Sequence, residues 1–433
     1  MKKNKLYSSL RLNAEWTIKP RIVNAITTVV YLTLLFQSQY TKIIADPSSA
    51  VEKIISYIPI LMAFAIVVYS LFVRKKSSAV REGKEIVRMY FPYFILIVMS
   101  LVFAFCFNQY AISLYGVKYL SRFFIKLLLR VSFIIIVVCS WLINKKDCIR
   151  TLKNAVILDG FLIILLAIRE HGLSQTMLAC IAPLGLADEN EATYILEVHE
   201  ATFVIGLLLL YYLFNEKEKK RTIIILAILF VIGGKRIAFG ALAAALAVVL
   251  PISKSKNKRF YAFYALTIAV GCFAQLCLLY SGTFFYIMKR MNINLNNRDL
   301  IYGFFLRRTD LNPLYFGWGF SAVSRVIENM KVSEVKWMVV IRGLHCDILK
   351  QYIEFGFLGF IYWLYFILIR LPSKLYRKLG EKSAKTYMLL MIFAIVTYMT
   401  DNTESYFLFQ STLLLLALAA SKEKPLLYRL RDH

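Results

Sequence analysis

The chain has 433 residues with 59% hydrophobic and 18% charged side chains and a mean hydropathy of +0.62, which is too apolar for an ordinary soluble domain. About a dozen membrane-spanning helices of roughly 20 residues would use most of this length, which excludes a large soluble catalytic domain, and no alternating ten-residue strands indicate an outer-membrane barrel. The net charge of +27 does not indicate a nucleic-acid partner, because most basic residues stand in short gaps between apolar runs, where membrane topology places them.

Twelve apolar runs follow one another along the chain and predict an all-α polytopic membrane protein, with residues 1–433 forming a single integral membrane domain. The gaps alternate between rich and poor in basic residues, so that 33 of the 53 fall on one side of the membrane. The positive-inside rule then places both termini in the cytoplasm. The runs are 22–40, 54–73, 90–107, 123–143, 155–168, 194–214, 222–234, 237–252, 261–280, 351–371, 386–400 and 405–420.

Cysteine usage carries no signal for a metal or a disulfide framework. The seven cysteines include four inside apolar runs, Cys106, Cys139, Cys272 and Cys277, and none forms a C-x-x-C pair. Neither a zinc site nor a set of disulfides is therefore predicted, and we expect no metal and no cofactor.

The longest gap, residues 281–345, is predicted to be an external loop between the ninth and tenth helices. It carries nine basic residues against four acidic ones, although the topology does not require positive charge there. Attraction to anionic lipid head groups explains part of this charge, and a bound anion is the other explanation. Because arginine binds diphosphate oxygens well, Arg298, Arg307 and Arg308 are candidate substrate contacts.

Five basic residues lie inside predicted spans or at their external edges. Arg122, Lys126 and Arg130 are spaced by four residues, so they share one face of a helix that enters the membrane from outside. A charge inside the bilayer costs several kcal/mol unless it has a partner or a wet cavity, so Arg130, the deepest, is predicted to face a functional cavity. Snorkelling explains the other two equally well. Lys235 and Arg236 predict a tight external turn that either binds an anion or is an ordinary hairpin.

His345 lies where the external loop meets the next helix. Its ordinary pKa suits a proton acceptor near neutral pH. Asp347 and Glu354 follow on the same helix and would orient His345 or the acceptor, or else supply polarity at the helix entrance. His199 and Glu200, near the external end of the sixth run, would bind sugar hydroxyls or a cation, or simply form a wet helix end.

Four motifs in the second half of the chain occur in an order, spacing and sidedness that resemble the O-antigen ligase and Wzy-type polymerase superfamily. The resemblance covers about residues 220–420, and the first half only in topology. Asp401-Asn402 in the last external turn is a further similarity to the polymerases. The motifs are Arg236 in a short turn, Asn297-Arg298-Asp299-Leu300-Ile301-Tyr302, Phe316-Gly317-Trp318-Gly319-Phe320, and His345 running into Glu354-Phe355-Gly356-Phe357-Leu358-Gly359.

The resemblance implies a GT-C-like membrane glycosyltransferase on the outer face of the bacterial cytoplasmic membrane. Its substrates would be oligosaccharides carried on undecaprenyl diphosphate, with Arg236 and Arg298 holding the diphosphate and His345 acting as the base. Lys235 departs from the family pattern, which often has serine there. We therefore expect a polymerase of repeat units for O-antigen, capsule or another surface polysaccharide. The alternatives are a ligase that uses the same residues and, from another class, a lipid-linked oligosaccharide flippase or transporter; a chain-length regulator is left open as a partner.

Overall fold

The computed structural model is helical, with no strand, over the residues that it describes, which are 20–421 without 44–54, 56, 73–76, 109, 183–195, 197–198, 255–257, 293–294, 296–297 and 331–342. The all-α prediction is thus confirmed, and a helix lies over most of each predicted apolar run. These helices are α2 (Pro20–Ile43), α4 (Ile58–Phe72), α5 (Ser77–Phe107), α6 (Tyr110–Asn144), α7 (Asp147–Ile181), α9 (His199–Asn215), α10 (Lys220–Ile232), α11 (Arg236–Lys254), α12 (Lys258–Tyr280), α16 (Asp347–Tyr365), α18 (Glu381–Tyr398) and α19 (Phe407–Ala419).

Five of the described helices are long and apolar enough to cross a membrane, by length and composition. A further five apolar helices have shorter described stretches of 10–17 residues. Several apolar helices of spanning length are what a multi-pass membrane protein requires. The five long segments are Arg81–Phe107, Gly116–Asn144, Asp147–Ile181, Tyr261–Tyr280 and Asp347–Leu379.

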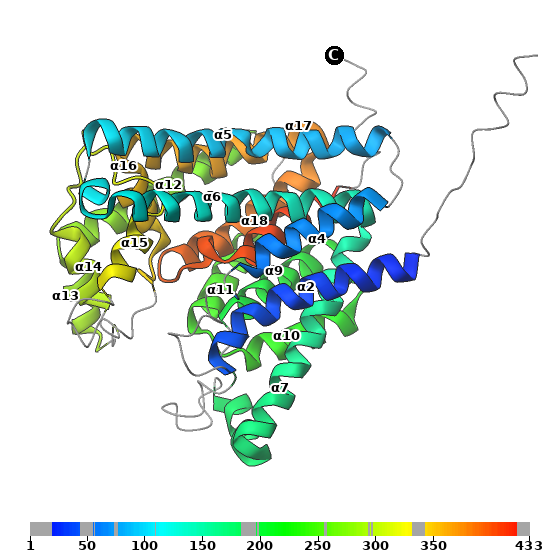
Figure 1. The fold of residues 1–433 in the computed structure, drawn as a ribbon. Helices are drawn as coiled ribbons and strands as arrows, with labels where there is room; N and C mark the ends of the chain where they lie inside the picture. The colour runs from blue at the N-terminus through cyan, green and yellow to red at the C-terminus, as the bar shows by residue number, and fades with distance from the viewer. Residues whose placement is uncertain are drawn as a thin grey trace, which may run out of the picture.

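The long helices α5 and α6 lie side by side along one edge of the bundle (Figure 1). Glycines divide α6 and α7 into two parts each, because Gly116 and Gly172 have φ angles of 46° and 80° that a helix does not allow. Beyond Gly172, the end of α7 turns away from the bundle and runs along its lower edge (Figure 1).

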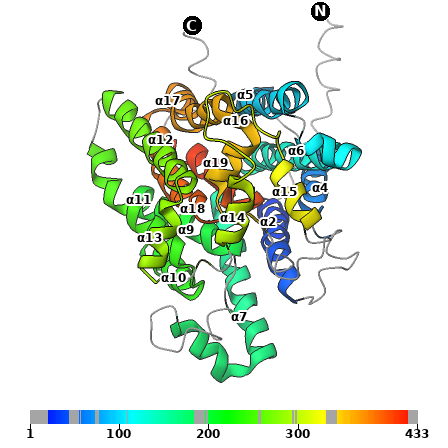
Figure 2. The ribbon, with the colours of Figure 1, turned by 90° about the vertical axis from the view of Figure 1, so that its left-hand side faces the viewer.

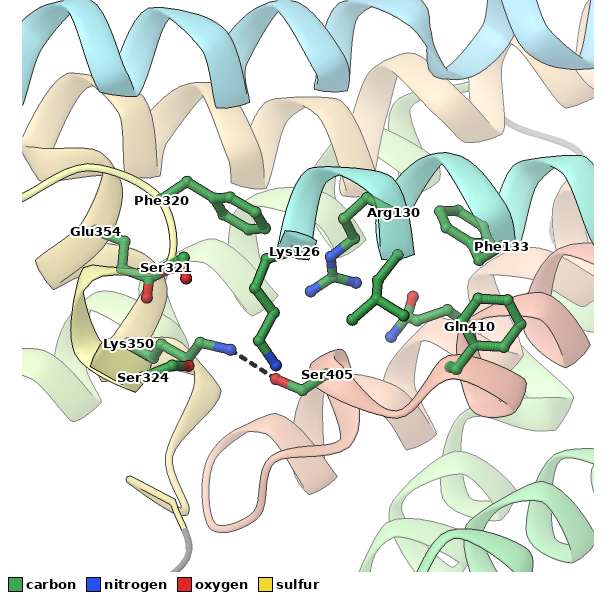
Figure 3. Close-up of a pocket in the computed structure, with 12 residues that line it drawn as sticks. Lys126, Arg130, Phe133, Phe320, Ser321, Ser324, Lys350, Glu354, Ser405 and Gln410 are labelled. Carbon is green, nitrogen blue, oxygen red and sulfur yellow. Dashed lines mark hydrogen bonds between the residues drawn. The ribbon is translucent and has the colours of Figure 1, made fainter. Parts of the chain in front are cut away.

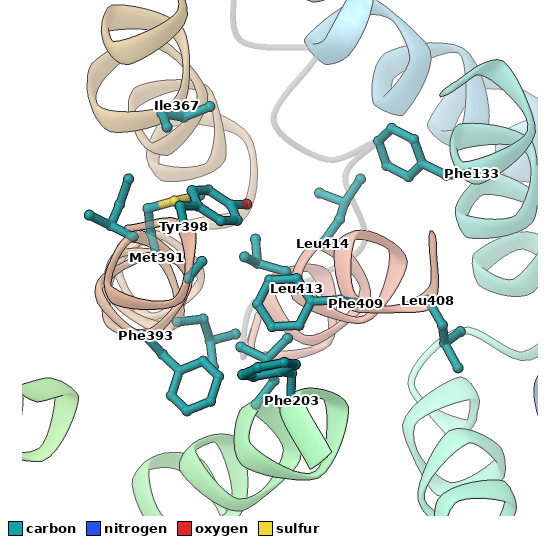
Figure 4. Packing of buried hydrophobic residues seen from close by; sticks show 14 of the residues in the cluster. Phe133, Phe203, Ile367, Met391, Phe393, Tyr398, Leu408, Phe409, Leu413 and Leu414 are labelled. Carbon is teal, nitrogen blue, oxygen red and sulfur yellow. The ribbon is translucent and has the colours of Figure 1, made fainter. Parts of the chain in front are cut away.

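The centre of the protein is formed by α9, α18 and α19, whose aromatic rings meet in one cluster (Figure 4). The ring of Phe409 on α19 lies 6.2 Å from Phe203 on α9 and 6.4 Å from Phe393 on α18. A Cβ atom on Gly206 would lie 2.5 Å from the Phe393 ring, so the glycine allows this approach. Nearly all of α18 is buried, as expected for a central helix that is apolar on every side.

The predicted loop at 281–345 is folded rather than irregular. It contains α13 (Thr283–Arg290), α14 (Arg298–Leu306) and α15 (Ala322–Met330). These short helices gather at one end of the bundle, beside the start of α16 (Figures 1 and 2). Segment 331–342 within the predicted loop lies outside the described residues.

Two of the sequence motifs meet through their glycines. Gly317 and Gly356 have φ angles of 82° and 71°, and a Cβ on Gly317 would lie 2.5 Å from the backbone nitrogen of Gly356. Gly356 interrupts α16, and the Trp318 N–H donates to the carbonyl oxygen of Ile353 at 2.8 Å. The segment before α15 is thereby fixed by main-chain hydrogen bonds against the break in α16.

Candidate active site

The candidate site is built around the turn between α18 and α19, which contains η4 (Thr403–Ser405). The turn is buried, with Asp401 and Glu404 each 3% exposed. Glu200 on α9 stabilises the end of this turn, because its carboxylate accepts hydrogen bonds from the N–H groups of Leu408 at 2.5 Å and Phe409 at 3.3 Å. These N–H groups belong to the first turn of α19 and have no partner within the helix. Glu200, predicted to bind substrate, thus caps a helix.

His345 is fixed against this turn through its backbone. Its φ angle of 52° lies in the left-handed region, which a residue with a side chain adopts at a cost. The N–H donates to Asn402 Oδ1 at 2.9 Å, and the carbonyl accepts the hydroxyl of Tyr302 at 2.8 Å. The surrounding residues therefore hold His345 in one unusual conformation.

The imidazole of His345 faces Asp401. The distance from Nδ1 to Asp401 Oδ1 is 3.4 Å, and the His345 side chain is 30% exposed. An N–H on Nδ1 that points at a carboxylate leaves Nε2 as the proton acceptor. The structure therefore pairs the predicted base with Asp401, and not with Asp347, which lies two residues further along the chain.

Asp401 is held in its anionic form. Burial raises the pKa of Asp401, but the hydrogen bond from His345, the charge of Lys235 and the N–H of Asn402 together bring that pKa below its usual value. Lys235 Nζ lies 3.5 Å from Asp401 Oδ2, and the Tyr406 hydroxyl donates to Oδ1 at 3.3 Å. An ionised Asp401 stabilises a positively charged imidazole beside it.

Further cations lie at the same turn. Arg298, the first residue of α14, donates from Nη1 to the carbonyl of Thr400 at 2.8 Å. A guanidinium has five N–H donors, so this bond leaves the others for an anion. Arg236 begins α11 and directly follows Lys235, which places its backbone near Asp401. The structure therefore gathers His345, Lys235 and Arg298 at one turn, with Arg236 adjoining.

Arg130 lines a cavity, and its charge is already engaged. Its Nη1 donates to the carbonyl of Glu404 at 2.8 Å, and Nη2 forms an ion pair with the Glu404 carboxylate. The Tyr93 hydroxyl donates to the same carboxylate at 3.0 Å, and the N–H of Glu404 donates to Asp347 Oδ2 at 2.6 Å. These bonds fix the turn from the membrane interior, so Arg130 and Asp347 act here as positioning residues.

The cavity beside Arg130 has a volume of about 50 Å³ (Figure 3). Lys126 and Lys350 point into it, and Lys350 Nζ donates to Ser405 Oγ at 2.6 Å. Glu354 accepts the N–H of Val323 at 3.2 Å with one carboxylate oxygen, while the other is buried without a hydrogen-bond partner among the described residues. This volume has room for a few water molecules and not for a sugar.

Other predicted residues lie elsewhere. Arg122 forms an ion pair with Glu328 of α15. Arg307 and Arg308 follow α14, are exposed and donate to carbonyls of α14 four residues earlier. His199 begins α9, but its side chain lies outside the described part of the structure. None of these contacts joins His345.

The sequence prediction missed Glu404 entirely and treated Asp401 only as a point of family resemblance. A signal was present, because Asp401 and Glu404 lie in a short polar segment between two apolar runs. An arginine inside a membrane segment requires an acidic partner, and this segment offers one for Arg130.

Neither the comparison with protein-family models nor the comparison with curated proteins finds a match to this chain.

Proposed function

We propose that this protein is a membrane glycosyltransferase that joins undecaprenyl-diphosphate-linked oligosaccharide units into surface polysaccharide. The observation that carries the proposal is the His345–Asp401 pair, in which a histidine with a fixed backbone at φ 52° sets Nδ1 3.4 Å from a buried carboxylate. Lys235 and Arg298 bring positive charge to the same turn. A base and an anion-binding group are the two requirements for transfer from a diphosphate-linked sugar.

In the proposed reaction, His345 Nε2 accepts the proton of the acceptor hydroxyl while that oxygen attacks the anomeric carbon of the donor. The new glycosidic bond forms as the bond to the diphosphate oxygen breaks, and the diphosphate leaves with the electron pair. Arg298 and Arg236 stabilise the negative charge on the leaving group. Asp401 stabilises the imidazolium and holds its orientation.

The proposed setting is the bacterial cytoplasmic membrane, with His345 at the outer face and twelve spans in a GT-C-like arrangement. The support is the distribution of basic residues, 33 of 53 in the gaps opposite to the 281–345 segment. Both termini are then cytoplasmic; residues 1–19 and 422–433 lie outside those described. The membrane partner is the lipid-linked donor.

The test is a gene deletion in the host, complemented with wild type, His345→Ala or His171→Ala. His171 is an exposed histidine of α7 and serves as the matched control. We expect surface glycan with a single repeat unit in the deletion strain and with His345→Ala, and full-length polymer with the control. The glycan is analysed by size on a gel.

Two outcomes would replace the proposal. Full-length polymer that accumulates on the lipid carrier with no attached glycan would identify a ligase, which uses the same residues. Unchanged glycan length and attachment in the deletion strain would favour the transporter, and movement of labelled lipid-linked sugar across vesicles containing only this protein would establish it.

A further inference from the structure

A second and larger hollow lies away from His345. It is an apolar groove of about 650 Å³ between α12, α18 and the continuous helical column made of α16, η3 (Phe366–Arg370) and α17 (Leu371–Leu379). On α12 it is lined by Ala262, Ala265 and Ala269, which are spaced by three and four residues and share one helix face. Their small side chains leave the space open.

The backbone of the column shapes the opposite wall. The π-helical turn η3 supplies Leu368 and Ile369 to the groove, and Pro372 is the second residue after it. Proline has no N–H to donate to the preceding turn, which favours a widened turn before it. Tyr264 ties α12 to α18 by donating its hydroxyl to the Met388 carbonyl at 2.6 Å. The widened turn before Pro372 and the hydrogen bond between α12 and α18 thus determine the position of the two walls of the groove.

One end of the groove is basic. Arg377 lines it and is exposed, and Arg370 and Lys374 lie close by on the same column. Lys378 also lies there and is paired with Glu85 at 3.5 Å. Arg377 lies 21 residues beyond the break in α16 at Gly356, which corresponds to roughly 30 Å of helix at about 1.5 Å per residue. The basic end therefore lies at the opposite side of the membrane from the candidate active site.

We propose that this groove binds an acyl chain of an anionic phospholipid whose phosphate lies beside Arg377. The apolar lining matches a hydrocarbon chain, and the cluster of cations matches a phosphate in the leaflet opposite to His345. A donor lipid would place its diphosphate at the His345 end, so the groove binds a different lipid. This distinction between the two lipids rests on the proposed function, whereas the binding of phospholipid in the groove does not.

The test uses the purified full-length protein in detergent, titrated with phosphatidylglycerol or with phosphatidylcholine of the same acyl chains, and native mass spectrometry to count bound lipid. We expect preferential retention of phosphatidylglycerol. Arg377→Glu reverses an exposed charge and is expected to weaken its binding about tenfold. The control Arg150→Glu changes an exposed arginine of α7 outside the groove and is expected to bind as wild type does.

A second pair of variants tests the groove itself. Ala262→Trp places an indole in the groove at an exposed position, and is expected to reduce retention of both phospholipids. Thr267→Trp is the control, because Thr267 is exposed on α12 and does not line the groove. Equal retention of the two lipids by the wild type, or wild-type binding by either Arg377→Glu or Ala262→Trp, would overturn the proposal.

Discussion

The two halves of the column from residue 347 to residue 379 have opposite characters. The first half buries Asp347, Lys350, Gln351 and Glu354, which lie on one helix face and are each no more than 7% exposed. The second half turns apolar side chains toward the open groove beside α12. One helical column thus positions polar groups at one end through hydrogen bonds. At the other end it has a widened turn and borders an apolar space that the small residues of α12 leave open.

The stability of the polar half depends most on the ion pair between Arg130 and Glu404. Arg130→Met removes the cation and leaves the buried Glu404 carboxylate without its main partner. We expect the free energy of unfolding to fall by about 3–5 kcal/mol, measured as loss of thermal stability in detergent. The double variant Arg130→Met/Glu404→Gln removes the uncompensated charge and should recover part of that loss. Equal stability of the single variant and the wild type would contradict the structural role of the pair.

The boundary between the two halves is the break at Gly356. A Cβ there would lie 2.4 Å from the carbonyl carbon of Phe316, and the φ angle of 71° is unfavourable for alanine. Gly356→Ala should therefore lower the free energy of unfolding by about 2–3 kcal/mol, read as a lower midpoint of thermal unfolding. Gly271→Ala on α12, where a Cβ meets nothing within 4 Å, is the matched control and should change stability little.

The orientation of His345 depends on Asp401. Asp401→Asn keeps the shape but removes the charge, and we expect transfer activity to fall about tenfold to a hundredfold with assembly of the protein intact. The assay is single-turnover transfer with a lipid-linked oligosaccharide. The amide that replaces the carboxylate would still accept hydrogen bonds, so Asp401→Glu, which restores the charge, should recover more activity if charge is the main effect.

The same residue gives a dependence of stability on pH. Because the pKa of Asp401 is lowered in the folded protein, its ionic contribution is complete above the ordinary aspartate pKa of about 3.9 and decreases as the pH falls below it. When the pH is lowered from neutral to acid, the midpoint of thermal unfolding should therefore fall less for Asp401→Asn than for the wild type. An equal loss in the two proteins would contradict the ionised state.

The smallest effect is expected at the exposed arginines of the 281–345 segment. Arg307 is exposed and donates to the carbonyl of Gly303 in α14. Arg307→Ala should change the free energy of unfolding by less than about 0.5 kcal/mol and leave transfer activity near the wild-type value. A large loss of activity would show that the diphosphate site extends to α14.

The sequence predicted the helices well because a membrane helix is specified by a long apolar run. It did not predict the short helices within 281–345, because helices of eight or nine residues are too short to stand out as apolar runs. It placed His345, Lys235 and Arg298 among the site residues, and the structure brings them to one turn.

The orientation of these residues was less predictable. Sequence proximity favoured Asp347 as the partner of His345, but the first turn of α16 directs that carboxylate to the N–H of Glu404. Asp401, 56 residues away in the chain, takes its place. Such pairings depend on how the helices pack against one another. The periodicity within one helix does not predict this packing.

The most direct test of the central claim is single-turnover transfer by purified wild type and His345→Ala across a range of pH, with a defined lipid-linked oligosaccharide as donor and acceptor. If His345 is the base, His345→Ala lowers the rate about a hundredfold to ten-thousandfold and changes the dependence of the rate on pH. A His345→Ala protein that is stable and retains both the wild-type rate and its pH profile would contradict the account.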